Sequence, residues 1–280
     1  MNKITQRLLI FFIGMPLVVC IALIKFKNHL FLHLILIVVS YLSALELNNM
    51  FSKKIAVQPK VLTGILTASV PAVGLFVSIF NLSNEWYYFT LTISIMIALS
   101  YEIFSKRNTD NFTSIIYRYF STVFSLMYIS FFISFISRLT PLEYSPIYIA
   151  TFLLMVFGCD SIAWLFGVTM GKNNRGLVKV SPNKSVAGFI GGFAGSIVFG
   201  IVVYMIYPYV FHNRIQNVVI IGFFVAISAI LGDLVESCIK RSVDCKDSGT
   251  IIPGRGGLLD SIDSILFSAP TFTLLLNFLL

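Results

Sequence analysis

Nine long apolar runs divide the chain, and they constrain its fold more than any other feature of the sequence. A helix needs roughly 20 apolar residues to cross the hydrocarbon core of a bilayer. Runs of about that length recur from one end of the sequence to the other. We therefore predict nine membrane-spanning helices, at about Leu8–Ile24, His29–Leu47, Val61–Phe80, Trp86–Phe104, Ile115–Ile136, Ile147–Val168, Ser185–Tyr209, Val218–Leu234 and Ser264–Leu280.

The composition excludes a soluble fold. Apolar residues make up 57% of the 280 residues and charged residues only 11%, whereas soluble domains carry about 25% charged residues. A soluble fold of this size could not cover so much apolar surface. The four cysteines form no Cys-x-x-Cys pair, so they indicate neither a disulfide framework nor a zinc site. We expect an all-α, polytopic integral membrane protein with about nine transmembrane helices.

The positions of the basic residues predict the orientation, because cytoplasmic loops of membrane proteins carry an excess of Lys and Arg. With a cytoplasmic N-terminus, all but four of the 20 Lys and Arg residues fall in cytoplasmic segments. The exceptions are Lys25, Lys27, Arg138 and Arg214. Lys25 and Lys27, in the first hairpin, go against the pattern. The formal net charge of +8 then reflects topology and phosphate chemistry, and no aromatic-studded groove indicates a nucleic-acid partner.

Polar residues are distributed unevenly along the chain. In residues 1–150 they lie mostly in short loops, whereas in residues 151–263 acidic and basic groups crowd two loops and the adjoining span ends. The predicted topology puts both loops in the cytoplasm. We predict a single transmembrane domain over residues 1–280, with scaffold-like spans in 1–150 and the catalytic part in 151–280.

The densest cluster of charge lies between Gly232 and Asp263 and holds six of the 12 acidic residues of the chain. Its charged residues are Asp233, Glu236, Lys240, Arg241, Asp244, Lys246, Asp247, Arg255, Asp260 and Asp263. One group follows the spacing of a single helix face: Asp233, Glu236, Ser237, Lys240 and Arg241. Asp260 and Asp263 can share a face where the last span begins. The glycines between them indicate a turn-rich loop that allows a ligand to approach closely.

Carboxylates at a membrane surface need partners, because isolated ones are costly to desolvate. They could pair with the neighbouring Lys and Arg residues, or they could gather Mg²⁺, which would hold a polyphosphate. A merely salt-bridged loop is the alternative interpretation. Surface ion pairs stabilise a protein little, and they do not require a glycine-rich loop between two acidic helix ends.

A second cluster combines Asp160, deep in an apolar run, with the segment Ser181-Pro182-Asn183-Lys184-Ser185. An acid within the membrane indicates a functional site, although it could also be a hydrogen-bonded structural residue. The segment delivers a lysine and hydroxyls to a helix N-terminus, which suits phosphate. It could equally be a positive-inside loop with a helix cap. The sequence contains no Walker A loop, dinucleotide glycine motif or His-Glu-x-x-His, and we interpret His29, His33 and His212 as structural.

Four short motifs, in this order, resemble the signature of the phosphatidate cytidylyltransferases, also called CDP-diacylglycerol synthases: Ser237-x-x-Lys240-Arg241, Lys246-Asp247-x-Gly249, Pro253-Gly254-x-Gly256-Gly257 and Asp260-x-x-Asp263. Asp160 and the Ser181–Ser185 loop resemble two further blocks of that family. Glu46, in the second predicted span, is similar to an acid that the family often has there. The resemblance covers residues 158–267 closely and the rest by the pattern of spans.

Three positions depart from the family pattern. Arg255 stands where the family usually has His, Ser261 where it usually has Arg, and Ala187 where it usually has Glu. We hypothesise that the first two changes are linked, with the guanidinium of Arg255 replacing the one missing at 261. Arg255→His would then be tolerated only together with Ser261→Arg.

The resemblance implies that CTP and phosphatidate react to give CDP-diacylglycerol and pyrophosphate, with Mg²⁺ and a possible second cation as cofactors. It implies catalytic roles for Asp233, Lys240, Arg241, Lys246, Asp247 and Asp260. It implies metal binding by Asp233, Asp247, Asp260 and Asp263. Binding of CTP or lipid phosphate would fall to Ser181, Lys184, Ser237, Arg255, Gly256 and Gly257. Supporting roles would fall to Asp160 and Glu236.

The expected setting is a bacterial plasma membrane, with the reaction at its cytoplasmic face and, by resemblance, a homodimer. Three alternatives stay open. One is a CTP-dependent transferase for another lipid phosphate. A second is an ion-coupled transporter that uses Asp160 and Glu102, although no inverted repeat supports it. The third is an inactive paralogue, because of the three departures.

Overall fold

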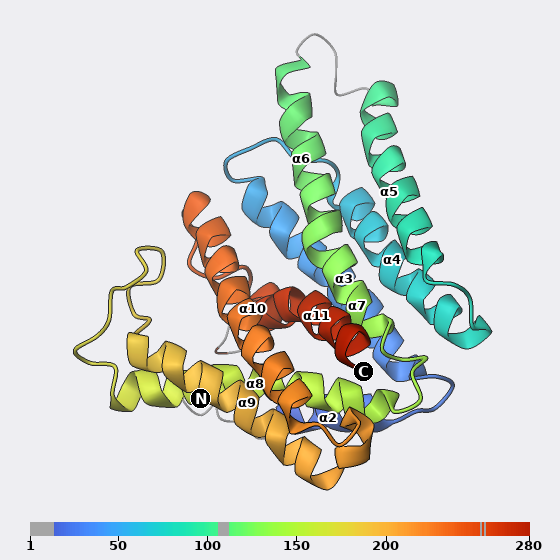
Figure 1. Ribbon diagram of the computed structural model, residues 1–280. Coiled ribbons are helices and arrows are strands. Elements are labelled where there is room, and N and C mark those ends of the chain that lie inside the picture. Colours follow the sequence, from blue (N-terminus) through green and yellow to red (C-terminus); the bar gives the residue numbers. More distant parts are fainter. Residues whose placement is uncertain (1–13, 106–111, 253, 255) are drawn as a thin grey trace. The chain divides into compact units, whose positions relative to one another are not determined.

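The computed structural model describes residues 14–105, 112–252, 254 and 256–280. These residues form helices and short helical turns (Figure 1): α2 (Met15–Leu23), α3 (Leu30–Phe51), α4 (Lys60–Phe80), α5 (Glu85–Phe104), η2 (Phe112–Ser114), α6 (Ile115–Ser125), η3 (Leu126–Phe131), α7 (Phe132–Ser137), α8 (Ser145–Thr169), α9 (Val186–Ile206), η4 (Pro208–Phe211), α10 (Ile215–Ser242) and α11 (Leu259–Leu279). Within them β-structure is limited to two isolated bridges, Arg175 with Ser185 and Ile252 with Gly256. The predicted all-α class is confirmed.

Eight of the nine predicted spans are helices long and apolar enough to cross a membrane. One of them is composite, because α6, the π-helical turn η3 and α7 run on as a single stretch, Phe112–Ser137. The remaining predicted span, Leu8–Ile24, contains α2, but residues 8–13 lie outside the described part of the chain. The predicted cytoplasmic N-terminus also lies outside it and stays a prediction.

Two helices extend beyond the predicted spans. α10 continues to Ser242 although the apolar run ends at Leu234, and α11 begins at Leu259 instead of Ser264. Hydropathy marks the part of a helix that suits the bilayer, whereas the backbone hydrogen bonds of a helix continue through polar residues. The predicted helical spacing of Asp233, Glu236 and Lys240 is confirmed by α10.

The chain folds as two compact units made of alternating segments. The first unit takes α2, residues 142–241 and residues 262–280; the second takes residues 26–141 and 242–261. The loop between α10 and α11 thus belongs with α3 to α7. The sequence predicts that residues 1–150 act as a scaffold and that residues 151–280 carry out catalysis. The division into two compact units does not test these roles, so they stay a prediction.

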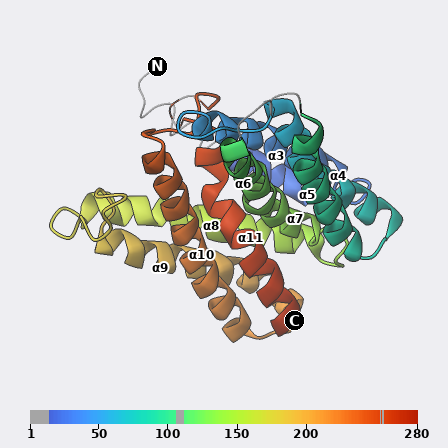
Figure 2. The same cartoon turned by 90° about the horizontal axis from the view of Figure 1, so that it is seen from above.

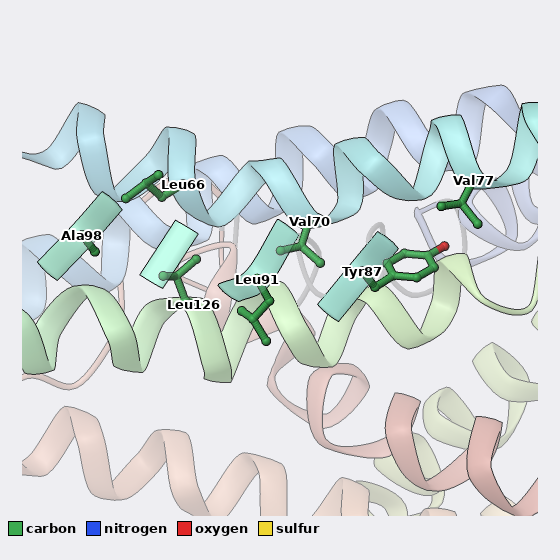
Figure 3. Close-up of a cluster of buried hydrophobic side chains, with 7 residues drawn as sticks. All are labelled: Leu66, Val70, Val77, Tyr87, Leu91, Ala98 and Leu126. Carbon is green, nitrogen blue, oxygen red and sulfur yellow. The ribbon is translucent and has the colours of Figure 1, made fainter. Parts of the chain in front are cut away.

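The second unit is a bundle of α3, α4, α5 and the α6–α7 stretch (Figure 2). Its apolar core, drawn in Figure 3, is contributed by Leu66, Val70, Val77, Tyr87, Leu91, Ala98 and Leu126. The same bundle buries a charged network, in which Arg118 Nη1 lies 3.1 Å from Glu102 Oε2 and the Gln58 amide donates to Glu102 Oε1 at 3.1 Å. These charges are balanced inside the bundle, as buried charges must be.

The first unit is organised around α8 and α9, which run side by side (Figures 1 and 2). Glycines allow this close approach, because a Cβ on Gly195 of α9 would collide with the carbonyl of Gly158 on α8. Small residues at a helix interface are the usual way for membrane helices to pack tightly. The loop that joins the two helices, residues 170–185, carries Lys184 and ends at Ser185, whose Oγ accepts from the Gly188 N–H at 3.0 Å. The predicted cap at the start of this helix is confirmed.

Candidate active site

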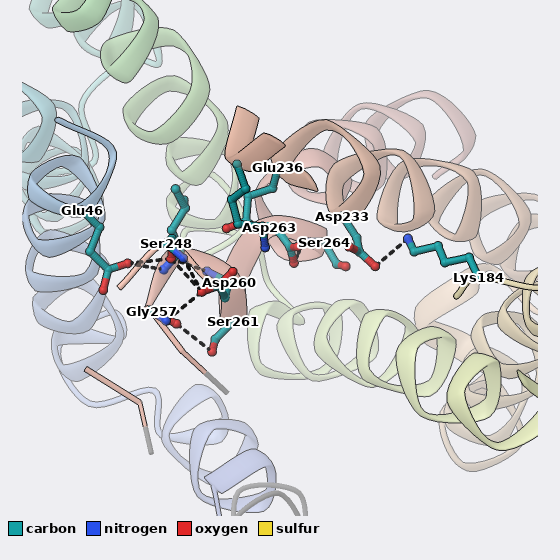
Figure 4. A network of polar contacts seen from close by, with 12 residues as sticks. Glu46, Lys184, Asp233, Glu236, Ser248, Gly257, Asp260, Ser261, Asp263 and Ser264 are labelled. Atoms are coloured by element: carbon teal, nitrogen blue, oxygen red, sulfur yellow. Dashed lines mark hydrogen bonds and ion pairs between the residues drawn. The ribbon is translucent and has the colours of Figure 1, made fainter. Parts of the chain in front are cut away.

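Two groups of carboxylates lie within the predicted catalytic region, one in each compact unit, and Figure 4 draws members of both. The Glu46 cluster, in the second unit, comprises Glu46, Ser248, Gly257, Leu258, Leu259 and Asp260. The Asp263 cluster, in the first unit, comprises Asp160, Lys184, Asp233, Glu236, Lys240, Asp263 and Ser264. Helix α11 contributes Asp260 to the Glu46 cluster and Asp263 to the Asp263 cluster. The two residues are three positions apart in the sequence.

The Glu46 cluster is built on a carboxylate from the last third of a membrane-spanning helix, α3. Glu46, on α3, is 5% exposed. Its Oε1 accepts from the Leu258 N–H at 2.9 Å, and its Oε2 accepts from the Leu259 N–H at 2.9 Å. These amides open α11, and the first amides of a helix have no partner within the helix. Glu46 therefore caps α11 from a distant part of the chain.

Asp260 closes the same loop from the other side (Figure 4). Its Oδ2 accepts from the backbone N–H of Ser248 at 2.8 Å, from the Ser248 hydroxyl at 2.9 Å and from the Gly257 N–H at 2.8 Å. The Ser248 hydroxyl also lies 3.1 Å from Glu46 Oε2. One serine thus links the two carboxylates of the cluster.

The glycines of the loop leave room for these carboxylates. A Cβ on Gly249 or on Gly257 would collide with the Glu46 carboxylate, and one on Gly256 would stand 2.7 Å from Asp260 Oδ2. Gly256 also has a φ of +116°, which L side chains rarely adopt. The sequence suggested that the glycines admit a ligand. In this structure they admit Glu46 and Asp260, and the N–H of Gly257 already donates to Asp260.

Two lysines that follow α3 hold the start of the loop within the same unit. Lys53 Nζ donates to Cys245 Sγ at 2.8 Å, and Lys54 Nζ lies 2.5 Å from Asp244 Oδ2. The hydrogen bond and charge of Asp244 raise the pKa of Lys54, and those of Lys54 lower the pKa of Asp244. Both side chains of this ion pair are exposed, so its contribution to stability is small.

Lys246 and Asp247, both predicted to be catalytic, are exposed on this loop. Neither has a hydrogen bond or ion pair within the part of the chain that the structure describes, so both are available to a ligand. Ser261 follows Asp260 on α11, and its hydroxyl lies 3.4 Å from the Gly257 carbonyl. Arg255 lies outside the described residues, so its predicted partnership with Ser261 stays a prediction.

The Asp263 cluster has a different character, since its carboxylates meet lysines and one another. Lys184 Nζ lies 2.6 Å from Asp233 Oδ2 (Figure 4), and Lys240 Nζ lies 2.7 Å from Glu236 Oε2. Asp263 is buried, and its Oδ1 accepts from the Ser264 N–H at 2.6 Å. The close packing of α10 against α11 at this point requires Gly232, since a Cβ there would stand 2.5 Å from the Asp263 carbonyl.

Asp160 joins this cluster through Ser264, whose hydroxyl donates to Asp160 Oδ1 at 3.3 Å. Asp160, Asp233 and Glu236 all lie within electrostatic range of Asp263. The cluster therefore holds more carboxylates than lysines, although among the described residues no three of its acids stand close enough to hold a metal ion. Such an excess of carboxylate favours the binding of a further cation, and carboxylate oxygens are the ligands that Mg²⁺ prefers.

The other residues singled out in the sequence lie near members of these clusters along the chain. Ser237, on α10 beside Glu236, is half-buried, and Arg241, near the end of α10, is exposed. Ser181 lies in the loop before α9, where its carbonyl accepts from the Lys184 N–H at 3.0 Å. Ala187, where the family usually has Glu, is buried in the first turn of α9.

Sequence reasoning left three participants out of the predicted site. Glu46 is indicated only by resemblance, and Ser248 and Ser264 are not among the predicted site residues. The signal for Glu46 was present, because an acid inside an apolar span needs a partner. No comparable signal marks a single serine, since serines are common in loops and at helix ends.

Comparison with known proteins assigns the chain to a family. The sequence profile of the Cytidylyltransferase family matches residues 5–279, so the chain belongs to this family. It is 33% identical to "Phosphatidate cytidylyltransferase" of Staphylococcus saprophyticus over 91% of this chain and 95% of that protein. It is 34% identical to the protein of the same name from Bacillus subtilis over 65% of each chain. With the one from Staphylococcus haemolyticus it shares 42% identity over 46% of this chain and 48% of that protein.

The family match spans both carboxylate clusters and all the described helices. The predicted resemblance is thereby confirmed, and with it the class of enzyme: a nucleotidyltransferase of the cytidylyltransferase family, built from membrane-spanning helices.

Proposed function

We propose that this protein is a phosphatidate cytidylyltransferase, which joins CTP and phosphatidate to give CDP-diacylglycerol and pyrophosphate. The observation that carries the proposal is the family match over residues 5–279, together with relatives of that name that cover up to 91% of the chain. Both carboxylate clusters fall within the matched residues.

The chemistry of the Asp263 cluster fits Mg²⁺. Asp233 and Asp263 are the proposed ligands in this cluster, supported by Asp160 and Glu236. Among the described residues no three His, Cys, Asp or Glu side chains are gathered closely enough to hold a metal ion, and lysines engage Asp233 and Glu236. Lys184 would therefore have to leave Asp233 when a cation binds. Bound Mg²⁺ would neutralise charge on the phosphates of CTP.

Asp247 and Asp260 remain proposed ligands as well, alone or with a second cation. Asp247 is exposed and has no partner among the residues described. In Asp260 the oxygen Oδ2 accepts from Ser248 and Gly257, which fixes the carboxylate at the start of α11.

The basic residues would bind phosphate. Lys246 is exposed and free of protein partners among the described residues, so it is the first candidate for the triphosphate of CTP. Lys184 would turn to phosphate once released from Asp233. Further contacts are proposed for Ser181, Ser237, Lys240, Arg241, Arg255, Gly256 and Gly257.

The proposed reaction needs no histidine base. A phosphate oxygen of phosphatidate attacks the α-phosphorus of CTP, the bond from that phosphorus to the bridging oxygen of the β-phosphate breaks, and pyrophosphate leaves with the bonding electrons. The attacking phosphate monoester is already a nucleophile at neutral pH. The protein therefore has to align the two substrates and balance their negative charge. Lysines and carboxylates, the residues of the two clusters, suit this task.

CTP is soluble and the acyl chains of the lipid are not. We therefore propose that the reaction takes place at the cytoplasmic face of a bacterial plasma membrane, and that the enzyme works as a homodimer. The competing transporter hypothesis used Asp160 and Glu102 as ion sites. Glu102 forms a buried ion pair with Arg118 and accepts from Gln58, so its charge is already balanced inside the protein.

The decisive experiment is CTP turnover by the detergent-purified protein with phosphatidate and Mg²⁺, following CDP-diacylglycerol and pyrophosphate. EDTA and Asp260→Asn serve as controls. We expect product that needs both the lipid and the metal, and a kcat that Asp260→Asn lowers by several orders of magnitude while leaving it measurable. Folded protein that binds CTP but makes no product from phosphatidate would point to another lipid phosphate. Folded protein that neither binds nor turns over CTP would support the inactive paralogue.

A further inference from the structure

We propose that Glu46 is a positioning residue for the reaction, which holds Asp260 and the glycine-rich loop in place from helix α3. This inference rests on the proposed function only where activity is measured. The carboxylate touches neither substrate in the proposed reaction. It acts through the backbone of Leu258 and Leu259 and through the hydroxyl of Ser248.

The burial of Glu46 shows that its carboxylate depends on this loop. A buried carboxylate is costly unless it is hydrogen-bonded or paired with a cation. Every partner recorded for it comes from the α10–α11 loop or from the first residue of α11, at separations of 202, 212 and 213 residues along the chain. None of these partners is a lysine or an arginine. Glu46 is therefore held by three neutral donors, and it holds them in turn.

The hydrogen bonds of Glu46 surround Asp260. Leu259 directly precedes Asp260, and Ser248 donates its backbone N–H to Asp260 while its hydroxyl lies between the two carboxylates, 3.1 Å from Glu46 and 2.9 Å from Asp260. A serine hydroxyl has a single proton to donate. A change at Glu46 therefore alters the hydrogen bond between the Ser248 hydroxyl and Asp260. The position of Asp260 is thus tied to Glu46 by both the backbone and a shared hydroxyl.

The glycines give independent support. Gly249 and Gly257 have ordinary backbone angles, since neither is among the residues with positive φ. At Gly249 the three atoms nearest to an added Cβ all belong to Glu46, whereas at Gly257 a Cβ would collide with the Ser248 hydroxyl, with Glu46 and with the Gly249 backbone N. Gly249 is therefore fitted to a carboxylate from α3, and Gly257 is fitted both to that carboxylate and to the loop itself.

The test compares Glu46→Gln with a double variant, Glu102→Gln with Arg118→Gln. Glu102 is also a buried acid on a helix of the second unit, and the double change removes a buried charge pair without leaving either partner alone. Hydrogen exchange is measured first. In Glu46→Gln we expect the amides of Leu258 and Leu259 to exchange at least about tenfold faster, since bonds to a charged acceptor are among the stronger ones. In the double variant they should keep wild-type rates.

Activity with CTP and phosphatidate is measured next. At equal folded fraction, kcat should fall about 10- to 100-fold in Glu46→Gln, as is common when a residue that orients a metal ligand is lost, with KM for CTP changed less than threefold. Glu46→Asp keeps the charge but is one methylene shorter. Its kcat should lie between the kcat of the wild type and that of Glu46→Gln. The double variant should stay within twofold of wild-type kcat.

The strongest readout is the combination of Glu46→Gln with Asp260→Asn. If Glu46 acts through Asp260, adding Glu46→Gln to the Asp260→Asn variant should cost less than threefold, whereas independent roles would multiply. Multiplied losses, or unchanged exchange of Leu258 and Leu259 in folded Glu46→Gln, would overturn the inference. An inactive wild type would instead refute the proposed function. Hydrogen exchange would then still decide whether Glu46 holds the loop.

Discussion

The two carboxylate clusters differ in what holds their acids. In the Glu46 cluster the described partners of Glu46 are two backbone N–H groups and a hydroxyl, all neutral. In the Asp263 cluster Asp233 and Glu236 meet lysines. A backbone amide is fixed by the chain, whereas a lysine side chain is flexible and a stronger cation can displace it. The comparison indicates that the Glu46 cluster maintains a shape and that the Asp263 cluster exchanges its partners.

The largest expected effect on activity concerns the Asp263 cluster. Asp233→Asn keeps the size of the side chain but removes its charge, so kcat should fall by about 100- to 1,000-fold if Asp233 binds the cation. Steady-state turnover at saturating Mg²⁺ measures this, with the thermal midpoint as a check of folding. A loss smaller than tenfold in a folded variant would mean that Asp233 does not bind the catalytic cation.

The second prediction concerns Lys184. Removing the lysine in Lys184→Met frees Asp233, so Mn²⁺ used as a probe should bind tighter, by up to about fivefold for a partly exposed ion pair. The KM for CTP should rise in the same variant, because a phosphate contact is lost. Electron paramagnetic resonance titration of free Mn²⁺ measures the binding. Weaker Mn²⁺ binding in Lys184→Met would contradict the exchange of partners.

The third prediction concerns the Glu46 cluster. Gly249→Ala introduces a Cβ that collides with Glu46, which should destabilise the fold by about 1–3 kcal/mol. Gly167→Ala is the matched control. Its Cβ would stand 3.6 Å from the nearest atom, Ser185 Oγ, and alanine is the better helix former. Thermal unfolding in detergent compares them, and equal midpoints would show that the loop can move away from Glu46 freely.

The smallest effect is expected at the exposed pair of Lys54 and Asp244. The lowered pKa of Asp244 means that the pair stabilises the fold above the usual pKa of an aspartate, and that this contribution is lost as the pH falls through the lowered value. The raised pKa of Lys54 places the opposite loss at high pH. Asp244→Asn should therefore reduce the acid sensitivity of the thermal midpoint slightly. Asp247→Asn, an exposed acid of the same loop, should not.

Much of the fold followed from local pattern. Hydropathy located eight spans, because the length of an apolar run is set by the bilayer, and helical spacing placed Asp233, Glu236 and Lys240 on one helix. What the sequence could not reveal were contacts between distant segments. Nothing near Gly249 shows that its missing side chain makes room for Glu46, and nothing near Asp233 shows that its partner is Lys184. Such pairs are set by tertiary packing.

The resemblance to a family supplied the chemistry that local pattern could not. Carboxylates and lysines at helical spacing are compatible with both a salt-bridged loop and a nucleotide site. The order of the four motifs favoured the nucleotide site, and the family match confirmed the family that those motifs resemble.

The long separation between Glu46 and its donors has a consequence for how the protein is made. Leu258 follows Glu46 by 212 residues, which a ribosome that adds about 5–20 residues per second needs roughly 10–40 seconds to translate. During that interval α3 carries a carboxylate whose capping amides do not yet exist. The nascent helix must keep that acid in contact with water, at the rim of the translocon or the bilayer, until the last loop emerges. The synthesis of Leu258 and Leu259 is thus also the step after which the end of α3 that carries Glu46 can be fully buried.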